Sequence, residues 1–279
     1  MLNVAQFKAK IKTSIKIVRE MLYADDSALV AHSVEDMQSL VDKFARVTSQ
    51  FSLLQINIKR KECLYQPPKF QLSTSLSKEI NIGTEPLVKC KTFKYLGSTV
   101  SENARLEDEL SLRMGRASAV FGNVRERLWN NRHVSIRVKC KVYRATVLAT
   151  LLYGTETWTV YRVQVKKLHA YTVRHLRAIM DISWEDKIAN IEVSKRAGLP
   201  SMEDMLIQMN LRWLRMDHQP LPQQLLYSQL CERKRNLAGP RLRFKDTVKR
   251  NLEKLDIDRS SWQQKAKDRA AWRNLTRPK

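Results

Sequence analysis

The chain has 279 residues, 43% hydrophobic and 28% charged, with only 7 Gly and 8 Pro, which predicts a globular and mainly α-helical protein. Its 51 Lys and Arg outnumber 28 Asp and Glu, and the net charge of +23 indicates a polyanionic partner such as nucleic acid. The absence of a long apolar run and the scattered positions of the 4 cysteines predict no membrane span and free thiols in a reducing compartment, nuclear or cytoplasmic.

The first element expected is a β-hairpin. Two short strand candidates, Glu20–Tyr23 and Ser27–Ala31, lie on either side of Ala-Asp-Asp, whose residues favour a turn. Ser33 then has the position and side chain of a helix N-cap, with acidic residues in the first turn. The predicted helix has one apolar face, formed by Met37, Leu40, Val41, Phe44, Val47 and Phe51.

Short strands are expected at Gln55–Ile58 and Cys63–Gln66, separated by the basic Lys59-Arg60-Lys61. The polar segment Pro67–Asn81 is typical of a loop. Phe93-Lys-Tyr-Leu-Gly97 predicts a further strand that ends in a glycine turn. The sequence thus begins with a small α+β part.

Everything beyond Gly97 is predicted to be helical. Long apolar stripes indicate helices at Leu106–Leu128, at Ser135–Leu151 and at Gln164–Met180. Ser183-x-x-Asp186 and Ser201-x-x-Asp204 are typical of two further helix starts. From Arg212 to Lys279 the sequence has 18 basic and 7 acidic residues, so the charge is concentrated at this end.

Asp25 and Asp26 are the leading candidates for chemistry. Adjacent carboxylates on a strand point to opposite faces, so both can serve one site only where the backbone turns. Carboxylates suit a hard cation such as Mg²⁺, and two such ions support in-line phosphoryl transfer. An Asp-Asp pair is most often only a polar turn tip. Here Tyr23 and the apolar strands predict a buried hairpin. Because burying charged groups is costly, its two carboxylates indicate a functional role.

The order of these motifs resembles the reverse transcriptases of non-LTR (LINE-type) retrotransposons. The segments that carry the resemblance are Tyr23-Ala-Asp-Asp26, Ser33-Val-Glu-Asp36, Ile56-Asn-Ile-Lys59, Phe93-Lys-Tyr-Leu-Gly97, Leu152-Tyr-Gly-Thr-Glu-Thr-Trp158, Arg174-His-Leu-Arg-Ala-Ile-Met180 and Arg241-Leu-Arg-Phe-Lys-Asp246. The resemblance implies a partial palm over residues 1–103, thumb-like helices over 104–160 and a basic helical C-terminal region over 161–279. It also implies Mg²⁺-dependent DNA synthesis on an RNA template from a DNA primer at a nicked target.

The resemblance also implies roles for individual residues. Asp25 and Asp26 would be the catalytic, magnesium-binding pair. The substrate-binding residues would be Tyr23, Lys59, Arg60, Leu96 and Gly97, with Lys59 or Arg60 near the incoming triphosphate and Leu96-Gly97 against the primer end.

The family needs a third carboxylate on an upstream strand, whereas the 22 residues before Tyr23 contain one acidic residue, Glu20. We therefore expect a C-terminal fragment that is not competent alone, for which an intact element protein could act in trans. After Arg212-Trp213 the sequence runs directly into Leu214-Arg215-Met216, which is shorter than the family pattern.

A second interpretation is a helical nucleic-acid-binding module without chemistry. Phosphate contacts would come from a dense basic segment that contains Arg233, Lys234, Arg235, Arg241, Arg243, Lys245, Lys249 and Arg250. The same segment can also be a solvated helix face. Trp262 and Trp272 are expected to dock a terminal helix rather than to stack on bases.

The helix predicted at residues 164–180 offers a further basic face. Lys166, Lys167, Arg174 and Arg177 suit contacts with a nucleic-acid backbone. A third interpretation is a product that folds poorly, because Leu22 and its neighbours Leu29 and Val30 would lack a covering layer.

Overall fold

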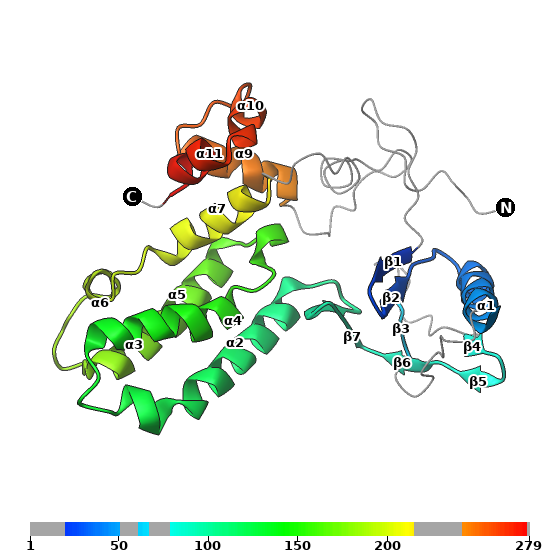
Figure 1. Cartoon of the computed structure of the whole chain (residues 1–279), viewed down its shortest axis with the longest axis horizontal. Coiled ribbons are helices and arrows are strands. Elements are labelled where there is room, and N and C mark those ends of the chain that lie inside the picture. Colours follow the sequence, from blue (N-terminus) through cyan, green and yellow to red (C-terminus); the bar gives the residue numbers. More distant parts are fainter. Residues whose placement is uncertain (1–19, 51–60, 67–78, 215–241, 278–279) are drawn as a thin grey trace. The chain divides into compact units, whose positions relative to one another are not determined.

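A computed structural model describes residues 20–50, 61–66, 79–214 and 242–277 of the chain. These residues form a mainly helical protein with four small two-stranded sheets (Figure 1). The chain divides into two compact units, Met1–Glu109 with Ser228–Gly239 and Leu110–Tyr227 with Pro240–Lys279. We call them the first and second unit. The prediction of a mainly helical fold is confirmed, whereas the three-part division into palm, thumb and basic region stays a prediction.

The predicted hairpin at the start of the first unit is present. Strand β1 (Glu20–Tyr23) pairs antiparallel with β2 (Asp26–Leu29), and Tyr23 lies opposite Asp26. The connection is therefore the dipeptide Ala24-Asp25, and Ala24 has a left-handed φ of 51°. The sequence predicted a three-residue tip and a second strand from Ser27 to Ala31, so Asp26 belongs to the strand rather than to the turn.

The expectation that this hairpin is buried is wrong for β1. Leu22 is 59% exposed and Tyr23 is 65% exposed, whereas Ala28 on β2 is 5% exposed. Among the described strands β1 pairs with β2 alone, so one of its edges and much of its apolar surface face outward. The predicted lack of a covering layer is thus confirmed for Leu22 and for Val30, which is 38% exposed.

Helix α1 (Val34–Gln50) begins where the sequence predicts. The Asp36 amide donates to Ser33 Oγ at 3.1 Å, which satisfies one free N–H of the first turn. The Gln38 side chain donates to the Asn81 carbonyl at 2.8 Å and accepts from the Asn81 amide at 2.9 Å. This pair of bonds fastens the next small hairpin to α1.

Six short strands follow α1: β3 (Glu62–Leu64), β4 (Asn81–Ile82), β5 (Glu85–Pro86), β6 (Val88–Cys90), β7 (Thr92–Tyr95) and β8 (Ser98–Ser101). β3 pairs in parallel with β6, and β7 pairs antiparallel with β8. Strands β4 to β6 and β8 were not predicted, because segments of two to four residues are too short to show alternation. The turn at Gly97 is therefore a hairpin tip rather than the end of the sheet region. Gln55–Ile58 lies outside the described residues.

The rest of the described chain is helical (Figure 1). Its elements are α2 (Leu106–Asn123), η3 (Arg125–Trp129), α3 (Ile136–Tyr143), η4 (Arg144–Leu148), α4 (Ala149–Leu151), η5 (Thr155–Thr157), α5 (Arg162–Met180), α6 (Asn190–Arg196), α7 (Met202–Trp213), α9 (Phe244–Lys254), α10 (Trp262–Lys267) and α11 (Arg269–Leu275). Ser201 caps α7 as predicted, with the Asp204 amide 3.1 Å from its Oγ. Ser183 does not start a helix, because Asp186 accepts from its amide in a turn and α6 begins only at Asn190.

Aromatic rings fill one core of the second unit. The rings of Phe121 on α2 and His175 on α5 are stacked 4.2 Å apart, and Tyr171 meets His175 edge-on at 4.3 Å. Trp129 also stacks on Phe121, with ring centroids 5.2 Å apart, and Tyr143 from α3 is fully buried. Helices α2, α3 and α5 are thus held together by these rings.

A second apolar cluster fixes the C-terminal helices onto α7. Trp272 is 1% exposed, and its indole N–H donates to the Leu211 carbonyl at 2.9 Å. Trp262 lies beside it with ring centroids 6.3 Å apart, and Val248 and Leu252 of α9 complete the cluster. The expectation that both tryptophans dock a terminal helix is confirmed.

The described helices are all too short or too polar to cross a membrane. Cys63, Cys90 and Cys140 are free thiols, and Cys231 lies outside the described residues.

Candidate functional site

Two carboxylates stand at the exposed tip of the β1–β2 hairpin. Asp25 occupies the turn and Asp26 begins β2, and both residues are exposed. Their oxygens suit Mg²⁺, which is held in many enzymes by one or two carboxylates together with substrate phosphates and water. Within the described ranges, His, Cys, Asp and Glu do not gather in groups of three that could hold a metal ion. Asp25 and Asp26 are a pair of neighbouring carboxylates at an exposed turn, and a hard cation there would need further ligands from substrate phosphates or water.

A second hairpin is attached to the first. The Tyr95 hydroxyl at the end of β7 donates to the Met21 carbonyl of β1 at 3.0 Å, across 74 residues of sequence. The next two residues, Leu96 and Gly97, form the tip of the β7–β8 hairpin with φ values of 46° and 80°. Two successive left-handed residues are typical of the tightest hairpin turns, and Gly adopts this conformation without strain. The structure thus links Tyr95, the residue before Leu96 and Gly97, to Met21, two residues before Tyr23.

A buried carboxylate fixes the other end of this second hairpin. Glu109, in the first turns of α2, is 4% exposed, and its Oε2 accepts from the Thr99 amide of β8 at 2.8 Å. Hydrogen bonds from a backbone amide to a carboxylate are among the stronger ones in proteins. This role was not visible in the sequence, because Glu109 resembles any acidic residue at a helix start.

The basic candidates are only partly described. Lys59, Arg60, Arg233, Lys234, Arg235 and Arg241 lie outside the described residues. Arg243 flanks the start of α9 and its Nε lies 2.6 Å from Asp246 Oδ2, and this contact lowers the pKa of Asp246. Lys249 and Arg250 are exposed on α9, whereas Lys245 is half-buried, and desolvation lowers its pKa. Arg243 is thus paired with an acidic residue in the first turn of the helix that follows it.

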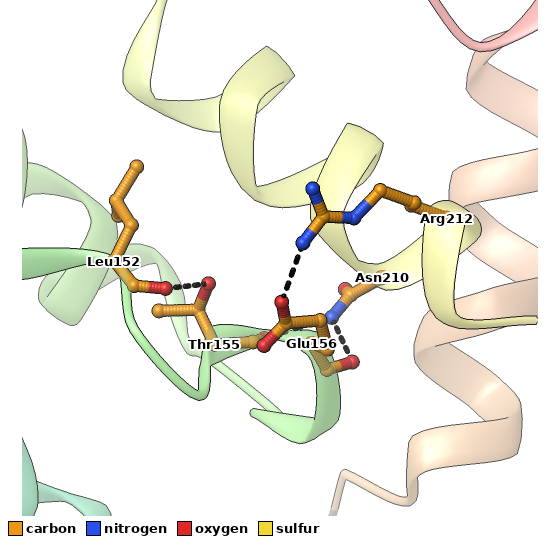
Figure 2. Close-up of polar contacts among 5 residues, drawn as sticks. All are labelled: Leu152, Thr155, Glu156, Asn210 and Arg212. Atoms are coloured by element: carbon orange, nitrogen blue, oxygen red, sulfur yellow. Dashed lines mark hydrogen bonds and ion pairs between the residues drawn. The ribbon is translucent and has the colours of Figure 1, made fainter. Parts of the chain in front are cut away.

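The segment Leu152–Trp158 forms a tight turn that docks on α7 (Figure 2). Gly154 has a φ of 78°, and Thr155 Oγ1 donates back to the Leu152 carbonyl at 2.8 Å. Asn210 of α7 donates to the carbonyls of Thr155 at 3.1 Å and Glu156 at 2.7 Å. Asn251 of α9 in turn donates to Asn210 Oδ1 at 3.0 Å. This buried network joins three elements, which is a structural role rather than a reacting site.

Glu156 is also engaged at the edge of this turn. Its Oε1 lies 2.9 Å from Arg212 Nη2, so its charge is neutralised by a neighbouring guanidinium (Figure 2). Two sequence segments that the resemblance singled out separately, Leu152–Trp158 and the region of Arg212, therefore meet in space.

His175 and Arg177 on α5 have structural roles. Desolvation in the aromatic core, followed by the nearby charge of Arg174, lowers the pKa of His175 to about 4. Arg177 donates to the carbonyls of Ser183 and Ile188 and to Asn190 Oδ1, so it holds the connection to α6. Arg177 is therefore engaged within the fold, and a contact of this residue with a nucleic-acid backbone stays a prediction.

Two sets of described residues can thus carry chemistry or binding. The carboxylates at the β1–β2 tip offer oxygen ligands to a hard cation. Exposed Lys and Arg side chains of the second unit offer hydrogen-bond donors to phosphates. Comparison of the chain with models of protein families, with curated proteins and with solved structures gave no match.

Proposed function

We propose that the chain is part of an RNA-directed DNA polymerase of the non-LTR retrotransposon type, in which Asp25 and Asp26 hold Mg²⁺. The observation that carries the proposal is the bond between the Tyr95 hydroxyl and the Met21 carbonyl. It joins the hairpin with the carboxylates to the hairpin of Leu96 and Gly97. The resemblance assigns the first to catalysis and the second to the primer end.

The small sheets and α1 would then be part of a palm, and α2 to η5 would be thumb helices. Bound Mg²⁺ would neutralise phosphate charge and activate the primer hydroxyl. Asp25 and Asp26 would supply its carboxylate ligands, and the strained two-residue turn would keep both side chains at one end of the hairpin. Tyr23, opposite Asp26, would border the same site.

Metal-directed cleavage tests the proposed ion site without requiring polymerase activity. Fe²⁺ replaces Mg²⁺ at oxygen sites and, with ascorbate, cuts the backbone nearby. We expect cleavage around residues 23–28 of the full chain, suppressed by excess Mg²⁺ and lost in Asp25→Asn and Asp26→Asn. Glu85→Gln on the exposed β5 strand is the matched control and keeps the cleavage. Unchanged cleavage in both aspartate variants would remove the ion site from this hairpin.

Primer extension tests the competence of the chain. On poly(rA) with oligo(dT) and Mg²⁺ we expect no templated synthesis by this chain alone. Synthesis that is abolished by Asp25→Asn would show that the chain is competent alone and would strengthen the polymerase assignment.

A non-catalytic, basic nucleic-acid-binding module is the second candidate. This function is favoured by the net charge of +23 and by the exposed Lys and Arg side chains of the second unit. For this function the affinity for nucleic acid falls steeply with salt, because bound phosphates release counterions. A flat dependence of log K on log salt concentration would exclude it.

A further inference from the structure

The region from Arg127 to Met180 is almost free of carboxylates. It contains eleven Lys and Arg but a single acidic residue, Glu156. Because Glu156 is paired with Arg212 at 2.9 Å, this region has no carboxylate left to compensate its cations. Such a surplus repels itself in the folded state unless a polyanion binds there.

Not all of these cations are available. Lys139 is 7% exposed and donates to the Trp129 carbonyl at 2.7 Å, where it caps the end of η3. Arg177 holds the connection to α6. These two side chains have structural roles, so only the other Lys and Arg side chains of the region can bind a ligand.

Helix α5 gathers four of the remaining cations on its outer side. Its buried residues, which include Leu168, Leu176 and Ile179, face the core. Arg162, Lys166, Lys167 and Arg174 are exposed, and we call them the α5 basic stripe. None of the four is paired with a carboxylate of the described residues. The 19-residue helix itself contains no acidic residue.

The dimensions of the stripe suit a nucleic-acid backbone. Arg162 and Arg174 are twelve residues apart, which corresponds to about 18 Å along a helix at 1.5 Å per residue. Double-stranded DNA carries roughly one charge per 1.7 Å of its axis, so several phosphates lie within this length. Ala170, exposed in the middle of the stripe, leaves room for close approach of a backbone.

The composition of the same face argues against two other ligands. Membrane-binding helices insert bulky side chains such as Trp, Phe or Leu, whereas Val163 is the largest apolar side chain exposed on this helix. Single strands are held largely by stacking on aromatic side chains, and the stripe has none.

We propose that the α5 basic stripe is a binding site for the phosphate backbone of a nucleic-acid duplex. The site lies outside the hairpins that carry Asp25 and Leu96. It needs a nucleic-acid partner but no polymerase chemistry, so it stands even if the proposed metal site fails. Its contacts are independent of base sequence, because phosphates position a protein without reading bases.

The test measures binding of the full chain to a 24-base-pair DNA duplex over a range of NaCl concentrations. The variant Lys166→Gln/Lys167→Gln/Arg174→Gln removes three cations of the stripe. We expect its log K to fall less steeply with log salt, by roughly 0.9 for each phosphate that the variant no longer neutralises. At low salt the affinity is expected to fall by about tenfold or more.

The matched control is Lys265→Gln/Lys267→Gln/Arg273→Gln, which removes two Lys and one Arg from exposed positions on α10 and α11. It has the same net charge as the stripe variant, so a larger loss in the stripe variant supports the site. Equal losses in both variants would show that only the overall charge matters and would overturn the proposal. Unchanged duplex binding in the stripe variant would do the same.

Two further measurements complete the test. Thermal unfolding of both triple variants is expected to match that of the parent, because all six positions are exposed. Vesicles containing phosphatidylserine provide the alternative anionic surface. Loss of vesicle binding in the stripe variant, with duplex binding intact, would assign the stripe to membranes and overturn the proposal.

Discussion

Asn210 joins three elements of the second unit through its side-chain amide. The residue is 2% exposed, and its amide donates to two carbonyls of the η5 turn and accepts from Asn251. An alanine there would leave these buried groups without partners, and each such group costs about 1–3 kcal/mol.

We expect Asn210→Ala to lower the free energy of unfolding by roughly 2–4 kcal/mol in urea denaturation. Arg212→Ala is the control on the same helix. Its ion pair with Glu156 is exposed on the arginine side, and such pairs contribute about 0–1 kcal/mol. Similar losses in the two variants would contradict the role assigned to the buried network.

The burial of His175 leads us to expect that the free energy of unfolding depends on pH. Its pKa is lowered to about 4 in the fold, from an ordinary value of 6.5, so the neutral ring is favoured in the native state. The stability that this provides is complete above about pH 6.5 and is lost as the pH falls from 6.5 through 4.

Urea unfolding of the parent and of His175→Phe between pH 4 and 7.5 measures this effect. The phenyl ring keeps the stacking on Phe121 but does not titrate, so the variant is expected to lose less stability than the parent on acidification. His169→Gln, on another side of α5, is expected to follow the parent. An identical pH profile for the parent and His175→Phe would refute the assignment.

At the scale of elements, Trp272 fixes the C-terminal helices. Its ring fills the cluster between α7 and α9, and its indole bonds to Leu211. We expect Trp272→Ala to cost about 3–5 kcal/mol, with faster amide hydrogen exchange in α9, α10 and α11. Trp184→Ala is the control, because Trp184 is 82% exposed and its loss is expected to change stability by less than about 0.5 kcal/mol.

The exposed strand β1 leads to a prediction about association between copies of the chain. Met21 and Leu22 expose apolar surface on β1, which pairs with β2 alone among the described strands. Exposed strand edges pair with other chains. Leu22→Thr keeps a residue that favours strands but removes the apolar surface, so we expect less aggregation in light scattering and unchanged thermal stability. More aggregation in this variant would contradict the prediction.

At the scale of the whole molecule, the net charge of +23 opposes folding through repulsion among Lys and Arg. Salt screens this repulsion over a Debye length of about 10 Å at 0.1 M. We therefore expect Tm to rise between 20 and 300 mM NaCl while affinity for a DNA duplex falls. A Tm that falls with added salt would mean that attractive pairs outweigh the repulsion.

Features that depend on neighbours in the sequence were predicted well. The β1–β2 hairpin, the Ser33 and Ser201 caps and the apolar stripes of α2 and α5 follow from local patterns of polar and apolar residues. The candidate carboxylates were also visible, since Asp25 and Asp26 stand at a turn that the sequence marks.

Other features depend on residues that are far apart and have no local pattern. The sequence by itself determined the helical character, the charge and the position of the Asp25–Asp26 turn. Only the tertiary structure decided which side chains are engaged. It showed that Tyr95 bonds to Met21, that Arg177 is held by the connection to α6 and that Lys166 and Arg174 have no ion pair with a carboxylate of the described residues. The physical reason is that a charged or hydroxyl side chain has the same local sequence pattern whether or not a partner lies within hydrogen-bond distance. Its partner is determined by the packing of helices and strands that are distant in the sequence.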